Sequence, residues 1–234
     1  MIRNLKALGL ALVAVFALSA TTASAASAQT QGTLTTSDGT AKTLLGTVDE
    51  DFLTGNSFTA FKEVVECTKT LYTGHKWNVT PHEAVPHKAT TATITPHYSD
   101  CFAFPGELPA TVFLNGCDYV VHIGETTGLS GNEYKATADI VCPPNKTIQI
   151  GVYSSSTHGL LLCTLDVMSA TGVGGAEWVH NKAGEGDDID LAGTFKPFTV
   201  VKSGLCGSAT DKEGKLDVNT TIEASDGTAV TITH

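Results

Sequence analysis

The sequence has 234 residues, of which 41% are hydrophobic and 16% are charged, and its formal net charge is -10. This composition excludes a chain that is disordered throughout, and the length suffices for one substantial core or two small ones. The acidic balance argues against a nucleic-acid partner and against adhesion to anionic lipid, because like charges repel.

The first 28 residues have the pattern of a cleaved secretory signal. A short basic segment precedes an apolar run from residue 7 to about residue 20, and Ala-x-Ala spacing follows within residues 23–28. The apolar run is shorter than the roughly 20 residues that cross a bilayer. We therefore expect a mature chain, residues 29–234, with no membrane span, which is secreted or held in the cell envelope.

Further along the chain, the hydrophobic pattern repeats every two residues, which is typical of half-buried strands. The alternating stretches are residues 88–95, 110–116, 118–124, 134–142, 147–153, 215–224 and 228–234. Turn residues separate them, including Asn-Gly at 115–116 and Pro-Pro-Asn-Lys at 143–146. The sequence predicts an all-β fold, an antiparallel β-sandwich stapled by disulfides, with a barrel as the alternative.

Three stretches have more specific interpretations. Residues 61–66 and 176–182 fit either a single helical turn or a strand. Residues 215–223 and 225–233 are predicted to form a final hairpin. The glycine-rich stretch 167–187 fits a long loop, or a joint to a smaller C-terminal β subdomain. We expect one domain over residues 29–234, because the cysteines are spread along it.

All six cysteines lie beyond the predicted signal, at Cys67, Cys101, Cys117, Cys142, Cys163 and Cys206. Their number is even, and no two have the close spacing of thiolate metal ligands, so three disulfides are expected. Six cysteines permit 15 pairings. Locality favours pairing 101 with 117 and 142 with 163, which leaves 67 with 206.

The amino-acid sequence around the cysteines resembles that of a group of uncharacterised secreted, cysteine-containing β-rich proteins of soil bacteria. The matching segments are PHYSDCFAF, LPATVFLNGCDYVVHIG, ADIVCPPNKTIQIGVYSS, LLCTLDV and SGLCG, which span about residues 60–210. The resemblance implies secretion, paired cysteines and strands, and it implies no activity.

Four histidines, His75, His82, His87 and His97, lie close enough in the sequence to raise the question of a zinc or copper site. The helical H-E-x-x-H motif is absent. After His82 and Glu83 the next histidine, His87, comes one residue too late, and prolines interrupt the segment. The alternative is a polar loop over residues 74–88 that leads into a strand. The acidic cluster at 185–190 raises a similar question for calcium, against a charged turn.

Aromatic side chains offer a different kind of site. Trp77 and Trp178 are flanked by polar residues, so they are the candidates for a sugar-binding face. No nucleophile motif, glycine-rich phosphate loop or dinucleotide fingerprint is present, and no cofactor is predicted. Paired carboxylates for glycoside hydrolysis depend on the fold and stay open.

These observations favour a secreted, non-enzymatic protein of the extracellular space or cell envelope that acts as a structural or binding module. Its partner is unknown, and a cell-surface polysaccharide or protein would fit. The alternatives are a carbohydrate-binding module and a secreted hydrolase that uses carboxylates.

Overall fold

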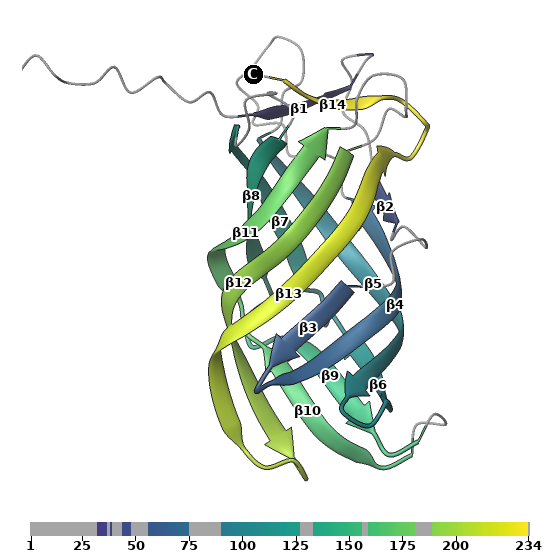
Figure 1. Cartoon of the computed structure of the whole chain (residues 1–234), viewed down its shortest axis with the longest axis vertical. Coiled ribbons are helices and arrows are strands. Elements are labelled where there is room, and N and C mark those ends of the chain that lie inside the picture. The colour runs from purple at the N-terminus through teal and green to yellow at the C-terminus, as the bar shows by residue number, and fades with distance from the viewer. Residues whose placement is uncertain are drawn as a thin grey trace, which may run out of the picture. The chain divides into compact units, whose positions relative to one another are not determined.

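The computed structural model describes residues 32–36, 38, 44–47, 56–74, 90–126, 133–155, 159–180 and 189–233. These residues form fourteen β-strands and no helix (Figure 1). The strands are β1 Thr33–Thr36, β2 Leu44–Thr47, β3 Asn56–Ala60, β4 Glu63–Gly74, β5 Thr91–Phe104, β6 Leu108–Phe113, β7 Asp118–Thr126, β8 Glu133–Val141, β9 Ile148–Tyr153, β10 Leu161–Val167, β11 Ala170–His180, β12 Ile189–Gly204, β13 Ala209–Ala224 and β14 Val230–Thr233. The all-β prediction is confirmed. Across these described ranges, no helical segment has the length and apolar character of a membrane span.

Twelve strands form one antiparallel sheet that closes on itself in two stacked tiers. Four long strands, β4, β5, β12 and β13, run through both tiers (Figure 1). In the upper tier of Figure 1 they pair with β7, β8, β11 and β2, and in the lower tier with β6, β9, β10 and β3. Each tier is therefore a closed ring of eight strands, which we call the upper tier and the lower tier.

The predicted sandwich is replaced by this closed barrel. In a sandwich, two sheets face each other across a core and each keeps free edges. Here two parts of β5 pair with β7 and β6 on one side, and on its other side β5 pairs with β4 from Ile94 to Phe104. Alternation along a strand is the same in both architectures, because each has one inward and one outward face. The pattern in the sequence could not distinguish them.

The predicted final hairpin is also wrong. β14 pairs with β1, near the other end of the chain, with Leu34 opposite Ile232. Leu34 and Val230 are fully buried, and the Gly32 N–H donates to the Gly124 carbonyl of β7. Apolar burial against the sheet therefore decided the partner of β14, although the 225–227 turn would have allowed a hairpin.

Within the glycine-rich stretch 167–187, interpreted as a loop or a joint, residues Ala170–His180 form β11, and residues 181–187 lie outside the described ranges. Two of its glycines, Gly172 and Gly175, have positive φ angles of 64° and 110°. A Cβ at Gly175 would lie 2.4 Å from the Thr194 carbonyl oxygen, so this close approach of β11 to β12 requires glycine. The stretch 63–66, for which a helical turn was an alternative, belongs to β4.

The three disulfides exist, but the predicted pairing is wrong. The bonds are Cys67–Cys101, Cys117–Cys142 and Cys163–Cys206. Cys67 lies opposite Cys101 on the paired strands β4 and β5, with a Cα–Cα distance of 4.0 Å. Cys117 directly precedes β7 and Cys142 directly follows β8, next to the pair Asp118–Val141, and their Cα–Cα distance is 4.1 Å. Locality along the sequence joined cysteines across single turns, whereas the register of paired strands determines which sulfur atoms meet.

Residues 31–234 form one compact unit. The predicted secretory signal lies outside the described residues. Three disulfides are consistent with an oxidising compartment, as expected for an exported protein.

Candidate functional site

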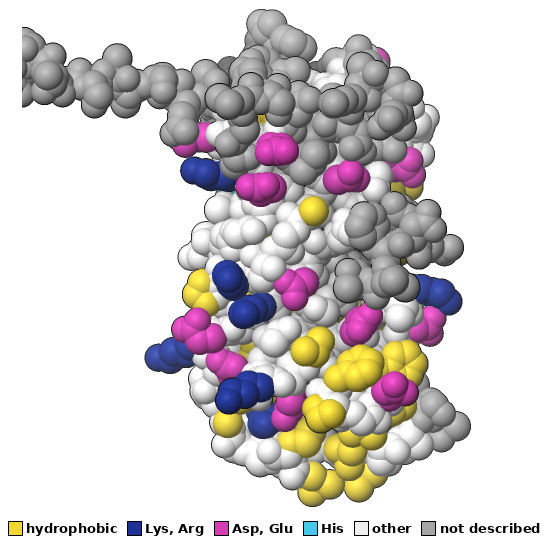
Figure 2. Space-filling model, viewed as in Figure 1, with side chains coloured by type: hydrophobic (Ala, Val, Ile, Leu, Met, Phe, Trp, Pro, Cys, Tyr) yellow, Lys and Arg dark blue, Asp and Glu magenta, His cyan; other side chains and the backbone are white. Residues whose placement is uncertain are grey.

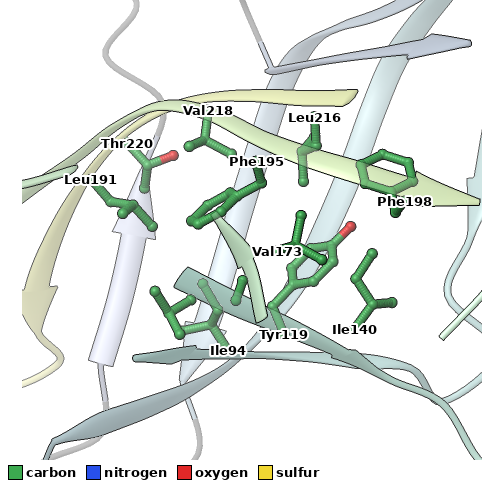
Figure 3. A pocket seen from close by; sticks show the side chains of 12 residues that line it. Ile94, Tyr119, Ile140, Val173, Leu191, Phe195, Phe198, Leu216, Val218 and Thr220 are labelled. Atoms are coloured by element: carbon green, nitrogen blue, oxygen red, sulfur yellow. The ribbon is translucent and has the colours of Figure 1, made fainter. Parts of the chain in front are cut away.

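The interior of the closed sheet is a packed core. The strands point apolar side chains inward, and Figure 3 shows eleven of them, together with Thr220, around a small central space. They are Ile94, Tyr119, Val121, Ala138, Ile140, Val173, Leu191, Phe195, Phe198, Leu216, Val218 and Thr220. The cavity measures about 20 Å³, which is room for one water-sized particle. A site for a larger ligand must therefore be sought on the outside of the described sheet.

The outer surface has a polar cleft at the seam between the two tiers. Three connections cross this seam, at residues 114–117, 142–147 and 168–169. The cleft has a volume of about 530 Å³, within the range of small-molecule sites. We call it the seam cleft, and it is lined by Asn115, Asn145, Lys146, Thr147, Gln149, Asp166, Met168 and Val201.

Two turns with left-handed residues form one wall of the seam cleft. Asn115 and Gly116 have φ angles of 54° and 84°, which identifies the primed turn that Asn-Gly favours. Asn145, with φ of 61°, follows two prolines, and the Lys146 N–H donates to the Pro143 carbonyl at 3.0 Å. Asparagine tolerates this conformation better than other non-glycine residues, so its presence has a local structural reason.

The other wall is a row of outward side chains on neighbouring strands. Phe113 of β6 lies opposite Gln149 of β9, which lies opposite Asp166 of β10, which lies opposite Val201 of β12. Their neighbours in sequence, such as Ile150 and Val167, point into the core. The period-two alternation thus turns these four side chains, two polar and two apolar, to one surface.

Hydrogen bonds hold the polar side chains of the cleft in place. Asp166 Oδ1 accepts from Thr147 Oγ1 and from Gln149 Nε2, each at 3.1 Å. The Asn115 amide donates through Nδ2 to the Thr147 carbonyl at 3.0 Å. These bonds leave Asp166 Oδ2, Gln149 Oε1 and Asn115 Oδ1 as acceptors for a ligand, while Lys146 supplies a donor.

A disulfide clamps the two turns together. Cys117 ends the first turn and Cys142 begins the second, and the Cys117 N–H donates to the Leu114 carbonyl at 2.9 Å. The turns are also in tight contact, because a Cβ at Gly116 would lie 3.2 Å from Pro143 Cγ. The disulfide therefore fixes the separation of the residues that line this wall.

Exposed apolar side chains surround one side of the seam cleft. Phe113 is 43% exposed, and Met168 is 38% exposed. Further exposed apolar residues of the lower tier are Phe102, Leu160, Leu161 and Leu205. Figure 2 shows hydrophobic side chains gathered on the lower tier on the face that it presents. An aromatic ring beside fixed polar groups is thus available for stacking.

A second polar arrangement lies on the outer face of the upper tier. His122 Nε2 of β7 lies 3.0 Å from Asp139 Oδ2 of β8, and the Gly172 N–H donates to Asp139 Oδ1 at 2.7 Å. The Gly172 hydrogen bond, with a further contribution from His122, holds the pKa of Asp139 below its usual value. Such an anchored carboxylate ties three strands together.

The sequence-predicted site residues have mixed outcomes. His75, His82, His87 and Trp77 lie outside the described residues. His97 lies on β5 opposite Leu71 and is exposed. Trp178 belongs to β11, where its backbone lies between Tyr134 of β8 and Leu191 of β12.

No group of three His, Cys, Asp or Glu residues in the described ranges is arranged to hold a metal ion. Within the acidic cluster that suggested calcium, Asp190 accepts a hydrogen bond from Thr221 Oγ1 at 2.8 Å on β13, and its acidic neighbours at 185, 187 and 188 lie outside those ranges.

The sequence reasoning missed the polar residues of the seam cleft. Both of its turns were recognised from Asn-Gly and Pro-Pro-Asn-Lys, and 147–153 was recognised as a strand. The available signal was that Thr147 and Gln149 lie on the polar face directly after a turn. The sequence did not show that Asp166 lies beside Gln149, because Asp166 belongs to a different strand, β10.

Comparison of the chain with known proteins gave no match to a family model, to a curated protein or to a solved structure.

Proposed function

We propose that this protein is an exported, non-enzymatic binding module of the extracellular space or cell envelope, and that it holds a carbohydrate in the seam cleft. The observation that carries the proposal is the tethered set Asn115, Thr147, Gln149 and Asp166 beside the exposed ring of Phe113. Trp77 and Trp178 stay the sequence-based candidates for a sugar-binding face.

The chemistry of the cleft matches a hydroxyl-rich ligand. A sugar hydroxyl both donates and accepts, so it can donate to the Asp166, Gln149 and Asn115 oxygens and accept from Lys146. The apolar face of a pyranose ring packs on an aromatic side chain, for which Phe113 is available. Because hydrogen bonds within the protein already fix the side chains, little conformational entropy is lost when the ligand binds.

The seam cleft fits a binding site better than the active site of a hydrolase, which would need two carboxylates. The described lining of the seam cleft contains a single carboxylate, Asp166. A glycosidase needs a carboxyl group whose pKa is raised so that it can act as an acid. The carboxyl groups of Asp139 and Asp211 have pKa values shifted downward by backbone N–H donors, which is the opposite direction.

The test is calorimetric titration of the wild-type protein with a panel of soluble polysaccharides and oligosaccharides, followed by the same titration of Asp166→Ala. We expect the variant to lose at least about ten-fold in affinity, because Thr147 and Gln149 lose their shared acceptor. Asp190→Ala is the matched control, since it removes a similar threonine–aspartate pair on another part of the surface. If no saccharide binds, or if Asp166→Ala binds as well as the control, the proposal is wrong.

Phe113→Ala separates stacking from hydrogen bonding at the same site. We expect it to weaken binding while the circular dichroism spectrum stays unchanged, because Phe113 is 43% exposed and does not belong to the buried core. The control is Leu205→Ala, which removes an exposed apolar side chain at the end of β12. Equal affinities of these two variants would contradict a role for the ring.

A further inference from the structure

A second cleft opens at the surface of the lower tier, where the turn between β3 and β4 meets β12 and β13. Its volume is about 580 Å³, which lies within the range of small-molecule sites. We call it the lysine cleft, and it is lined by Thr59, Ala60, Phe61, Lys62, Lys202, Asp211, Glu213 and Lys215.

Positive charge is concentrated in the lysine cleft. Three of the eight lysines in the described ranges line it, and they come from three different elements: Lys62 from the turn, Lys202 from β12 and Lys215 from β13. Against these three charges the lining has two carboxylates, Asp211 and Glu213, so its formal charge is +1, whereas that of the whole chain is -10. The local sign is therefore reversed, which favours an anionic ligand.

Lys202 is recessed and is held in a defined position. Its side chain is 13% exposed, and it lies opposite the buried Leu165, so it points to the inner side of β12. Lys202 Nζ donates to Glu63 Oε1 at 3.4 Å and lies 4.6 Å from the centre of the Phe61 ring. An ammonium group has three N–H donors, so donation to Glu63 leaves capacity for a ligand.

The backbone of the turn places Lys62 at the rim of the lysine cleft. Lys62 has a φ angle of 65°, in the left-handed region that favours glycine or asparagine. Asp211 holds this turn, because its Oδ2 accepts from the Phe61 N–H at 2.6 Å and its Oδ1 accepts from the Glu213 N–H at 2.8 Å. Both oxygens of Asp211 are thus engaged by backbone donors. Residues kept in a strained conformation by their surroundings are concentrated at binding sites.

We propose that the lysine cleft binds an organic oxyanion, which is a carboxylate or phosphate group attached to a small apolar body. The charged oxygens accept charge-assisted hydrogen bonds from the three lysines, and these are stronger at the recessed Lys202, where less water screens the charge. The apolar body packs against the ring of Phe61. A cleft of about 580 Å³ has room for such a body beside the anionic group.

This site is independent of the proposed carbohydrate site. The lysine cleft and the seam cleft share no lining residue. Val201 of the seam cleft and Lys202 are neighbours on β12, but alternation along the strand turns their side chains to opposite faces. Either proposal can therefore fail while the other stands.

The first test is calorimetric titration of the disulfide-bonded protein, at low salt, with benzoate, phenyl phosphate and inorganic phosphate. We expect saturable binding of benzoate or phenyl phosphate, and the tighter of the two identifies the anionic group. Inorganic phosphate lacks the apolar body, so it should bind at least about ten-fold more weakly than the tighter organic anion.

The second test removes charge from the rim. Lys62 and Lys215 are exposed, so Lys62→Met/Lys215→Met should fold normally and should lose at least about ten-fold in affinity for the organic anion. The matched control is Lys69→Met/Lys135→Met, which changes the net charge equally at exposed positions outside the cleft and should keep its affinity. Absence of saturable binding, equally tight binding of inorganic phosphate, or equal losses in the two double variants would each overturn the proposal.

Discussion

At the scale of single residues, the turn between β3 and β4 depends on contacts from distant parts of the chain. Its residues Phe61 and Lys62 have φ angles of 56° and 65°, although neither is glycine or asparagine. Asp211 Oδ2 accepts from the Phe61 N–H at 2.6 Å, and Lys202 Nζ lies 4.6 Å from the centre of the Phe61 ring. These tertiary contacts maintain a conformation that the local sequence disfavours.

Lys62→Gly should therefore stabilise the protein. Glycine adopts the left-handed region without the steric cost that a Cβ imposes, so we expect the free energy of unfolding to rise by about 1 kcal/mol. The measurement is urea denaturation followed by circular dichroism. Lys215→Gly, inside strand β13, is the control and should lower the free energy of unfolding, because the strand there needs no positive φ. A loss of stability in Lys62→Gly would contradict the strain argument.

At the scale of elements, threonine and serine hydroxyls donate hydrogen bonds to aspartate carboxylates of neighbouring segments of the sheet. The pairs are Thr95–Asp118, Thr147–Asp166, Thr194–Asp217, Ser57–Asp217 and Thr221–Asp190. Four of these five pairs join two strands on the outer face, where side chains at paired positions lie close together, and in the fifth Thr147 directly precedes β9. The abundant threonine of this acidic chain thus has a structural use besides its preference for strands.

The Cys117–Cys142 disulfide should matter for binding as well as for stability. Replacing both cysteines by serine releases the clamp between the turns of the seam cleft, so we expect weaker carbohydrate binding. The loop of 25 residues also predicts a loss of about 3 to 4 kcal/mol in the free energy of unfolding, by the loop-entropy model.

The matched control is the double serine variant of Cys163 and Cys206. It removes the disulfide that closes a loop of 43 residues and that does not join the two turns of the cleft. It should lose a similar amount of stability and keep its affinity for the saccharide. Calorimetric titration and urea denaturation of both variants make the comparison. Equal affinities in the two variants would show that the clamp has no part in binding.

At the scale of the whole molecule, closure of the sheet explains why the chain behaves as one unit from residue 31 onward. The long strands β12 and β13 lie next to each other along most of their length and belong to both tiers. Neither tier can open without breaking pairs in these strands. We therefore expect cooperative unfolding of the described sheet.

Acid should weaken this unit through anchored carboxylates. The pKa values of Asp139 and Asp211 are lowered chiefly by hydrogen bonds from Gly172 and Phe61. A carboxyl group whose pKa is lowered in the folded state stabilises the fold at pH values above its ordinary pKa, which is near 4. This stabilisation is lost as the pH falls from that value through the lowered pKa. Asp139→Asn/Asp211→Asn should therefore cost more stability at pH 7 than at pH 3, as measured by urea denaturation.

The control for this comparison is Asp100→Asn, which removes a solvent-exposed ion pair with Lys69. Exposed pairs contribute little, so its effect should be small at both pH values. An equal loss at pH 7 and pH 3 for the double variant would mean that the two carboxylates do not stabilise the fold through their charge.

The sequence determined the local features of this protein. Alternation at residues 147–153 and 134–142 predicted strands that are now β9 and β8, and Asn-Gly at 115–116 predicted the turn that bears Asn115. The even cysteine number predicted three disulfides. These features depend on backbone preferences and on side-chain polarity, which act within a few residues.

Only the tertiary structure decided how those strands were combined. Four features join segments that are distant in the sequence. They are the pairing of β14 with β1, the closure into two tiers, the pairing of the cysteines, and the hydrogen bond between Asp166 and Gln149. Many strands have similar apolar faces, so alternation alone does not select a partner. That choice comes from the burial and the hydrogen bonding that the complete closed sheet achieves at once.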